Sequence, residues 1–390
     1  MTAYKPALVL ALCVACSPTP PDSETAVATQ PGSGQFASAA AAGDTVYLSG
    51  QTAERGDPGD IESRTRSAMD KLGAVLQEQG LGFSNLVNCR LQLADMEDYQ
   101  TVNGIYASYF SAERYPARTT VQVAALPDDG SITVTCIAYR DAASMSIVRP
   151  APEVIPPAMG PYSPAVMAGN MLYVSGQGGR DPLTGETSPE AGAQTDRTLQ
   201  TIQATIAAEQ LGLDSVVTAA YYYPNLDDAA QIEARLAAAL PAGSGPAGAA
   251  VPVGRLPGDI LVEIAVIAAK DRYTVTRLFP PGEEPTAGVS PAVLAGNTLF
   301  VTALAMPEAG AGLEEQFQAI LTRQKLVLGL AEMDLSNVVY TDVYLGDVAD
   351  TEAARALIGE AFGANAPAGT IVGMKSLNGA KVMVGLTAAK

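Results

Sequence analysis

The sequence contains no histidine and no tryptophan. The absence of histidine excludes Ser-His-Asp and Cys-His nucleophile systems, histidine general bases and histidine metal sites. Cationic residues are few. The chain has 23 lysines and arginines and 41 aspartates and glutamates, which gives a net charge of −18 at pH 7. Binding to a phosphate backbone needs clustered cations, so this charge argues against nucleic acid as a partner. Any chemistry must come from arginine, carboxylates, tyrosine, serine or the backbone.

The N-terminus lacks an apolar segment long enough to span a bilayer. The apolar run 7–15 follows Lys5 and has about a third to a half of the required length, as in the h-region of a signal peptide. It ends at Cys16 and resembles a bacterial lipoprotein signal, although Cys13 replaces the usual leucine. We therefore expect a signal peptide over residues 1–16 and lipidation of Cys16. A cleaved secretion signal and a membrane-held signal are the alternatives.

Residues 17–34 are rich in Pro, Ser, Thr and Gly and predict a flexible tether. Together with the signal they predict an exported protein, periplasmic or on the cell surface, held at a membrane by its lipid. The remaining chain has ample material for packed cores, since 48% of all residues are hydrophobic.

One unit of roughly 120 residues is written three times. Each copy has an apolar strand that ends in a short four-residue motif, and this motif has diverged in the third copy. The three motifs are Leu48-Ser49-Gly50-Gln51, Val174-Ser175-Gly176-Gln177 and Val301-Thr302-Ala303-Leu304. A repeat of this length is a small domain, and the predicted domains are 35–142, 143–270 and 271–390, the last of them degenerate.

Each repeat predicts the order strand, long helix, strand, short helix, strand, strand, which is an α+β fold. The middle strands are predicted at 86–93, 216–223 and 338–345. The closing strand pairs are predicted at 119–126 with 132–139, 249–256 with 260–268, and 370–377 with 381–388. Pro252 cannot donate to a strand ladder and places its strand at a sheet edge, so we expect three sheets that close edge to edge.

Each middle strand is followed by an acidic turn that begins at Asp95, Asn225 or Asp347. These turns resemble metal ligands, but their position before the second helix favours helix caps and complements of the helix dipole. We predict no metal site and no cofactor.

Several motifs in the same order resemble the RidA/YjgF family of enamine and imine deaminases, over about residues 35–390. They are Gly160-Pro161-Tyr162-Ser163-Pro164-Ala165-Val166 and Gly169 to Gln177 in repeat two, and Val102-Asn103, Tyr115-Pro116-Ala117-Arg118 and Ala125-Leu126-Pro127 in repeat one. The resemblance implies chorismate-mutase-like domains in a homotrimer, with helices outside, sheets around a central barrel, and a small-acid site in each cleft between neighbours. Three copies in one chain would give a monomeric pseudo-trimer. An endoribonuclease activity, also attributed to some members, fits this histidine-free, acidic chain poorly.

The resemblance assigns functional residues repeat by repeat. The carboxylate-gripping arginine falls on Arg118, Gly248 and Gly369 in the three repeats. The glutamate that positions water falls on Thr133, Glu263 and Met383. The aromatic residue of the Gly-x-Tyr-Ser motif falls on Phe36, Tyr162 and Val289, and the helix asparagine survives only as Asn103.

No single repeat holds a full set, which predicts a decayed scaffold if each repeat acts alone. The family topology shares a site between neighbours, so one cleft could combine residues of repeats one and two. Its members would be Arg118, Asn103, Tyr162, Ser175, Gly176 and Glu263. The opposite cyclic order would instead direct Arg118 towards repeat three.

In such a cleft Arg118 would grip a planar carboxylate through two charge-assisted hydrogen bonds. Glu263 would take a proton from water attacking an imine carbon, and backbone N–H groups near Ser175 and Gly176 would orient the substrate. The products would be a 2-keto acid and ammonia, as for a 2-iminobutanoate/2-iminopropanoate deaminase. Arg118 could also be a surface ion pair, and Glu263 could point to solvent or to a structural partner. A non-catalytic carboxylate-binding module and a structural surface lipoprotein are the alternative functions.

The remaining cysteines, Cys89 and Cys136, fall on strands that the family topology makes neighbours. An oxidising compartment permits a disulfide, but directly paired strands often place the sulfurs badly. We expect two buried free thiols.

Overall fold

The computed structural model describes residues 36–53, 59–111, 114–375 and 377–390. The predicted signal peptide (1–16), with Cys16, and the tether (17–34) lie outside these residues. Among the described residues, no helix is both long and apolar enough to cross a membrane.

Three units follow one another along the chain, and each has a six-stranded sheet and two helices. Unit one contains β1 (Ala39–Ala42), β2 (Thr45–Leu48), β3 (Gln51–Thr52), α1 (Ile61–Glu78), β4 (Leu86–Leu93), α2 (Tyr99–Ala107), β5 (Ala117–Gln122) and β6 (Ile132–Tyr139). Unit two contains β7 (Ser146–Val148), β8 (Ala165–Ala168), β9 (Met171–Gly178), α3 (Ala191–Ala207), β10 (Val216–Tyr223), α4 (Ala229–Ala239), β11 (Ala247–Pro252) and β12 (Glu263–Ala269). Unit three contains β13 (Val275–Leu278), β14 (Ala292–Ala295), β15 (Thr298–Ala305), α5 (Leu313–Leu330), β16 (Val338–Leu345), α6 (Thr351–Phe362), β17 (Ala368–Gly373) and β18 (Val382–Ala389). The predicted α+β class is confirmed.

The sheets repeat one strand order. Sheet two runs β11-β10-β12-β9-β8-β7, and sheet three runs β17-β16-β18-β15-β14-β13 in the same way. Sheet one runs β5-β4-β6-β2-β1, and β3 also pairs with β6. In each, the middle strand pairs parallel with the edge strand and antiparallel with the last long strand. Pro252 lies in edge strand β11, as predicted. The sequence analysis missed the short strands β1, β8 and β14, because their alanine-rich sequences carry little β signal.

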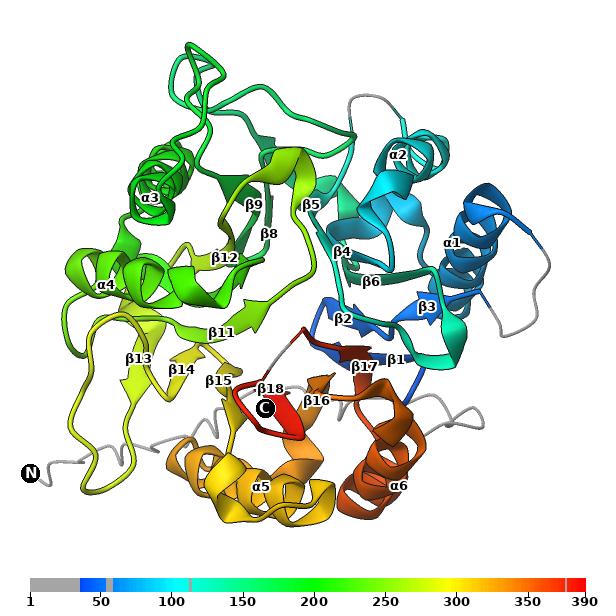
Figure 1. Cartoon of the computed structure of the whole chain (residues 1–390), viewed down its shortest axis with the longest axis vertical. Helices are drawn as coiled ribbons and strands as arrows, with labels where there is room; N and C mark the ends of the chain where they lie inside the picture. The colour runs from blue at the N-terminus through cyan, green and yellow to red at the C-terminus, as the bar shows by residue number, and fades with distance from the viewer. Residues whose placement is uncertain (1–35, 54–58, 112–113, 376) are drawn as a thin grey trace, which may run out of the picture.

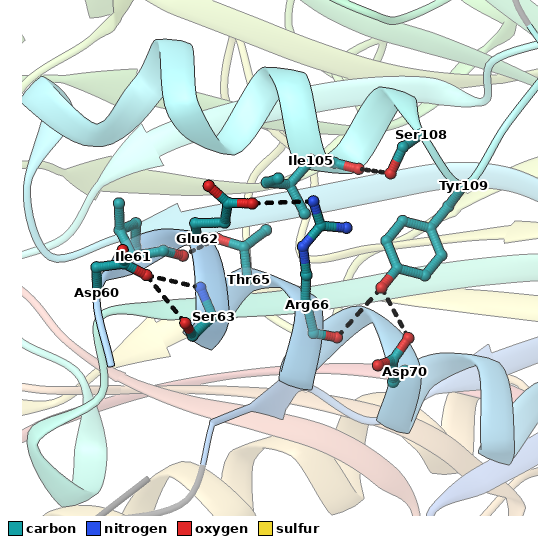
Figure 2. A network of polar contacts seen from close by, with 10 residues as sticks. All are labelled: Asp60, Ile61, Glu62, Ser63, Thr65, Arg66, Asp70, Ile105, Ser108 and Tyr109. Carbon is teal, nitrogen blue, oxygen red and sulfur yellow. Dashed lines mark hydrogen bonds and ion pairs between the residues drawn. The ribbon is translucent and has the colours of Figure 1, made fainter. Parts of the chain in front are cut away.

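Helix α1 shows why each unit packs as it does. Its apolar residues at helical spacing, Ala68, Leu72 and Leu76, are fully buried against the sheet. Asp60 caps its start by accepting from the Ser63 N–H at 3.0 Å. Figure 2 shows the polar contacts beside this core, including the Arg66 to Glu62 ion pair at 3.0 Å and the Tyr109 hydroxyl donating to Asp70 at 2.7 Å.

The acidic turns are caps, as predicted. The side chains that begin them each accept a backbone N–H two residues further on, and the acceptors are Asp95, Asn225 and Asp347. No group of three or more Cys, Asp or Glu side chains suited to a metal ion occurs in the described ranges.

The units contact one another in the cyclic order one, two, three, one. The same backbone bond occurs at every contact: Ser163 to the Pro116 carbonyl at 3.1 Å, Ser290 to Pro246 at 2.9 Å, and Ala37 to Pro367 at 3.0 Å. In Figure 1, helices α1 to α6 lie at the rim and the sheets face the centre. Equivalent apolar residues of all three units, among them Val121, Val251 and Val372, share one buried cluster there.

Cys89 and Cys136 form a disulfide, so the prediction of two free thiols was wrong. They stand directly opposite each other on β4 and β6, with Cα atoms 4.1 Å apart. This is the close spacing of an antiparallel pair that lacks mutual hydrogen bonds, and it brings the side chains near enough to bond.

Candidate active site

Arg118 lies at the contact between units one and two. It is the second residue of β5, only 3% exposed, and its backbone N–H donates to the Ser175 hydroxyl at 2.8 Å. That hydroxyl in turn donates to the Ser163 carbonyl at 2.6 Å. The alternative in which Arg118 meets repeat three is therefore contradicted.

The guanidinium of Arg118 is surrounded by tyrosines. It lies over the rings of Tyr99, Tyr106 and Tyr162, with centroid distances of 5.8, 5.2 and 5.6 Å. One nitrogen, Nη2, donates to the Tyr99 hydroxyl at 3.4 Å, whereas Nη1 is buried with no hydrogen-bond partner among the described residues. No carboxylate forms an ion pair with Arg118 in the described ranges. The group therefore keeps donor capacity for a ligand oxygen.

Gly160 brings the segment before β8 onto this arginine. A Cβ at Gly160 would lie 2.4 Å from Nη2 of Arg118 and 3.2 Å from Nδ2 of Asn103, so a larger residue would displace the guanidinium. Asn103 is buried, and its Oδ1 also lacks a partner in the described part of the chain. The Tyr162 hydroxyl accepts from the Met159 N–H at 3.2 Å, which holds the ring in place.

Glu263 is the first residue of β12 and is 6% exposed. Its carboxyl group lies over the backbone of Gly176, where a Cβ would be 1.9 Å from Oε1. Burial raises the pKa of Glu263 to about 8, while the Arg118 charge and a hydrogen bond from the Thr120 N–H act in the opposite direction. A carboxyl group with this pKa exchanges its proton near neutral pH, which suits general acid or base work.

A pocket of about 60 Å³ separates these groups. One water needs roughly 10–15 Å³ of such a cavity, so the pocket has room for about four to six waters. Its lining includes Arg118, Tyr99, Thr120, Tyr162, Gly176, Glu263 and Arg180. The pocket therefore combines an unpaired guanidinium with a protonatable carboxyl group.

All six predicted residues lie at the contact between units one and two, but Ser175 has a structural role there. Both hydrogen bonds of its hydroxyl are made within the protein, and the residue is fully buried. Thr302 and Ser49 make the matching bonds to Gly248 and Gly369 at the other two contacts. Ser175 thus joins two units. Its backbone N–H, which was predicted to orient the substrate, donates instead to the Pro164 carbonyl at 3.0 Å.

Three residues of the site were missed by sequence analysis: Tyr99, Thr120 and Arg180. Tyr99 could have been found, because it stands four residues before Asn103 on one helical face. The other two carry no comparable sequence signal.

The other two clefts lack this pair of groups. Strand register places Gly248 and Gly369 where unit one has Arg118, and Thr133 and Met383 where unit two has Glu263. At Gly369 the ring of Phe36 takes the space, since an added Cβ would be 2.7 Å from its Cε1. An arginine side chain could not enter there without displacing that ring.

Comparison with known proteins identifies the family. The family model described as Endoribonuclease L-PSP matches residues 27–140, 153–270 and 282–390. The chain therefore belongs to this family, which is also the RidA/YjgF family, and it carries the family domain three times.

Individual relatives match the length of one repeat. The RutC family protein slr0709 of Synechocystis is 38% identical over 113 residues, which are 27% of this chain and 85% of that protein. The 2-iminobutanoate/2-iminopropanoate deaminase of Bos taurus is 34% identical over 112 residues, 27% of this chain and 81% of that enzyme. A crystal structure of RidA from Psychrobacter sp. PAMC 21119 is 35% identical, covers 32% of this chain and 98% of that chain, and has a TM-score of 0.30.

Proposed function

We propose that the chain hydrolyses a small enamine or imino acid to a 2-keto acid and ammonia, at one site built between units one and two. The observation that carries this proposal is the pairing of a buried guanidinium that has an unpartnered nitrogen, in Arg118, with Glu263 across the same pocket. The names of the deaminase relatives support the reaction class.

The groups suit each step of the hydrolysis. Arg118 holds the substrate carboxylate with its free Nη1, and the three tyrosine rings fix the guanidinium plane. Glu263, as a carboxylate, takes one proton from a water molecule while the water oxygen bonds to the imine carbon. That proton passes to the nitrogen and gives a carbinolamine. The hydroxyl proton of the carbinolamine then moves, through Glu263, to the same nitrogen as the carbon–nitrogen bond breaks. Ammonia leaves, and the carbon keeps the oxygen as a ketone.

The proposal includes the arrangement of the chain. The three equivalent contacts within the chain would take the place of the subunit contacts of a homotrimer, so one chain would act as a monomeric pseudo-trimer. Sedimentation of the purified chain should then report about 40.0 kDa. A stable species of three chains at micromolar concentration would refute this part.

The central experiment measures imine hydrolysis. An amino-acid oxidase supplies the imine of 2-aminobutanoate, and capture of unreacted imine by semicarbazide is followed with and without the protein. The wild type should lower the captured fraction, and Glu263→Gln and Arg118→Met should not. Met383→Leu changes the matching position of an inactive cleft and serves as the control.

Calorimetry with 2-oxobutanoate completes this test. We expect one ligand per chain, lost in Arg118→Met and kept in Glu263→Gln. Binding without any hydrolysis by the wild type would favour a carboxylate-binding module. The absence of both would leave a structural lipoprotein.

We also propose that the protein is exported and anchored by lipid on Cys16. Labelling of cells with a palmitate analogue should mark the wild type and not Cys16→Ser, which should move to the soluble fraction. The lipoprotein modification supplies several acyl chains, and one chain alone binds a membrane weakly. Unchanged fractionation of the variant would argue against the anchor.

A further inference from the structure

We infer that the pocket selects imino acids whose side chain ends in a second carboxylate, and that Arg180 binds this distal group. The inference rests on the proposed function and adds the class of substrate. Arg180 lies two residues beyond β9 and lines the same pocket as Arg118 and Glu263. It is half-buried, so part of the residue is open to solvent.

A tight turn holds Arg180 in place. Its backbone pairs with Thr187, and its Nε donates to the Gly185 carbonyl at 3.0 Å. Asp181 closes the turn by accepting from the Leu183 N–H at 2.9 Å. The Nε of Arg180 is thus held by the turn, while its two terminal nitrogens remain available. Because the side chain is already ordered, less entropy is lost when a ligand binds these nitrogens.

The two terminal nitrogens of Arg180 have no protein partner within the described residues. The neighbouring carboxylate, Asp181, is taken by Arg197 at 2.8 Å. Most other arginines of this acidic chain pair with a carboxylate, among them Arg66, Arg90, Arg235 and Arg255. Arg118 and Arg180 are arginines without an ion pair among the described residues, and both line this pocket in a chain whose net charge is −18.

The charge of the pocket matches a dicarboxylate better than a monocarboxylate. Its charged lining residues are Arg118, Arg180 and Glu263, so two guanidinium groups stand against one carboxyl group. Burial also raises the pKa of Glu263 to about 8, which keeps that carboxyl group largely neutral at pH 7. One anionic group of a ligand would leave the second guanidinium without a partner.

The dimensions agree with this binding mode. The volume of about 60 Å³ suits the head of the substrate, which is the imine carbon with its nitrogen and carboxylate, held by Arg118. The rest of the substrate must then extend towards the opening. Apolar residues of the same pocket would contact its methylene groups; they are Pro156, Pro157, Met159 and Ile260.

The test compares imines made in situ from glutamate and from norvaline, which share their first carbons and differ in the terminal carboxylate. The wild type should show a kcat/KM at least tenfold higher for the glutamate imine. Arg180→Gln should lower that value about tenfold, mainly through KM, because a charge-assisted hydrogen bond is lost. The norvaline imine should change less than twofold, and Arg235→Gln, an exposed arginine of the same unit, should change neither.

Binding separates failure of this inference from failure of the hydrolysis proposal. If the wild type hydrolyses no imine, calorimetry with 2-oxoglutarate and 2-oxopentanoate still measures the preference for a second carboxylate. Tighter binding of 2-oxoglutarate that disappears in Arg180→Gln supports the inference. Equal affinity of the two acids, or a preference that survives in Arg180→Gln, overturns it.

Discussion

The buried guanidinium of Arg118 should lower the stability of the protein while it enables binding. Arg118 is 3% exposed, has no ion-pair partner among the described residues and leaves Nη1 without a hydrogen bond. Taking such a charge out of water costs several kcal/mol. Three tyrosine rings and the Tyr99 hydroxyl offset part of that cost. We therefore expect Arg118→Met, which keeps the length and removes the charge, to be at least as stable as the wild type.

Replacement of a whole buried ion pair by apolar residues of similar volume is often neutral or stabilising by about 1–4 kcal/mol, and Arg118 leaves no ion-pair partner behind when it is replaced. The same substitution should weaken 2-oxobutanoate by roughly tenfold to several hundredfold, because hydrogen bonds to a charged group are lost. Stability and binding should thus change in opposite directions. A residue with a purely structural part would lower both.

Urea unfolding, with and without ligand, measures both effects. At a ligand concentration of 100 times Kd the wild type should gain about 2.7 kcal/mol, and Arg118→Met should gain almost nothing. Arg90→Met is the control, because Arg90 is a half-buried arginine whose partner Asp342 would lose its counter-charge; breaking a fully buried pair costs about 3–5 kcal/mol, and this half-buried one should cost part of that. If Arg118→Met loses as much stability as Arg90→Met, the reasoning is refuted.

Three further predictions follow from the same contacts. Hydrolysis should rise with pH through about 8, because the carboxylate form of Glu263 takes the proton, and a pH profile of kcat that stays flat in the wild type would exclude this base. Cys89 and Cys136 are 47 residues apart, so reduction of their disulfide should lower the free energy of unfolding by about 4 kcal/mol. Urea unfolding with and without dithiothreitol measures this difference, and unchanged unfolding would mean that the thiols are free in solution. Gly160→Ala should weaken 2-oxobutanoate in calorimetry, since the new methyl group displaces the Arg118 guanidinium, and wild-type affinity would show that the segment moves freely.

The sequence predicted most of what depends on repetition and strand register. The middle strands β4, β10 and β16 begin and end at the predicted residues. Since register then fixes which residues stand opposite one another, Arg118 falls into line with Gly248 and Gly369, as the motifs had indicated.

The rest depends on contacts between distant residues. Nothing local shows that Cys89 and Cys136 form a close pair, because that spacing is set by the alternation of hydrogen-bonded pairs between β4 and β6. The backbone N–H of Ser175 was predicted to orient the substrate, and only the fold shows that it donates to the Pro164 carbonyl. Arg180 belongs to no motif, and only the folded turn brings it to the pocket.

At the centre of the molecule, equivalent positions of the three repeats carry different residues, which three identical subunits could not do. Arg90, Ala220 and Asp342 hold equivalent positions on β4, β10 and β16, and the arginine pairs with the aspartate across the contact between units one and three. Three identical subunits would place three arginines or three aspartates there, and like charges at close range repel one another. The pocket between units one and two depends on the same independence of the three repeats. It needs an arginine only in repeat one, at Arg118, and a glutamate only in repeat two, at Glu263. In one continuous chain a side chain such as Phe36 can fill another cleft. This filling does not alter the pocket that contains Arg118 and Glu263.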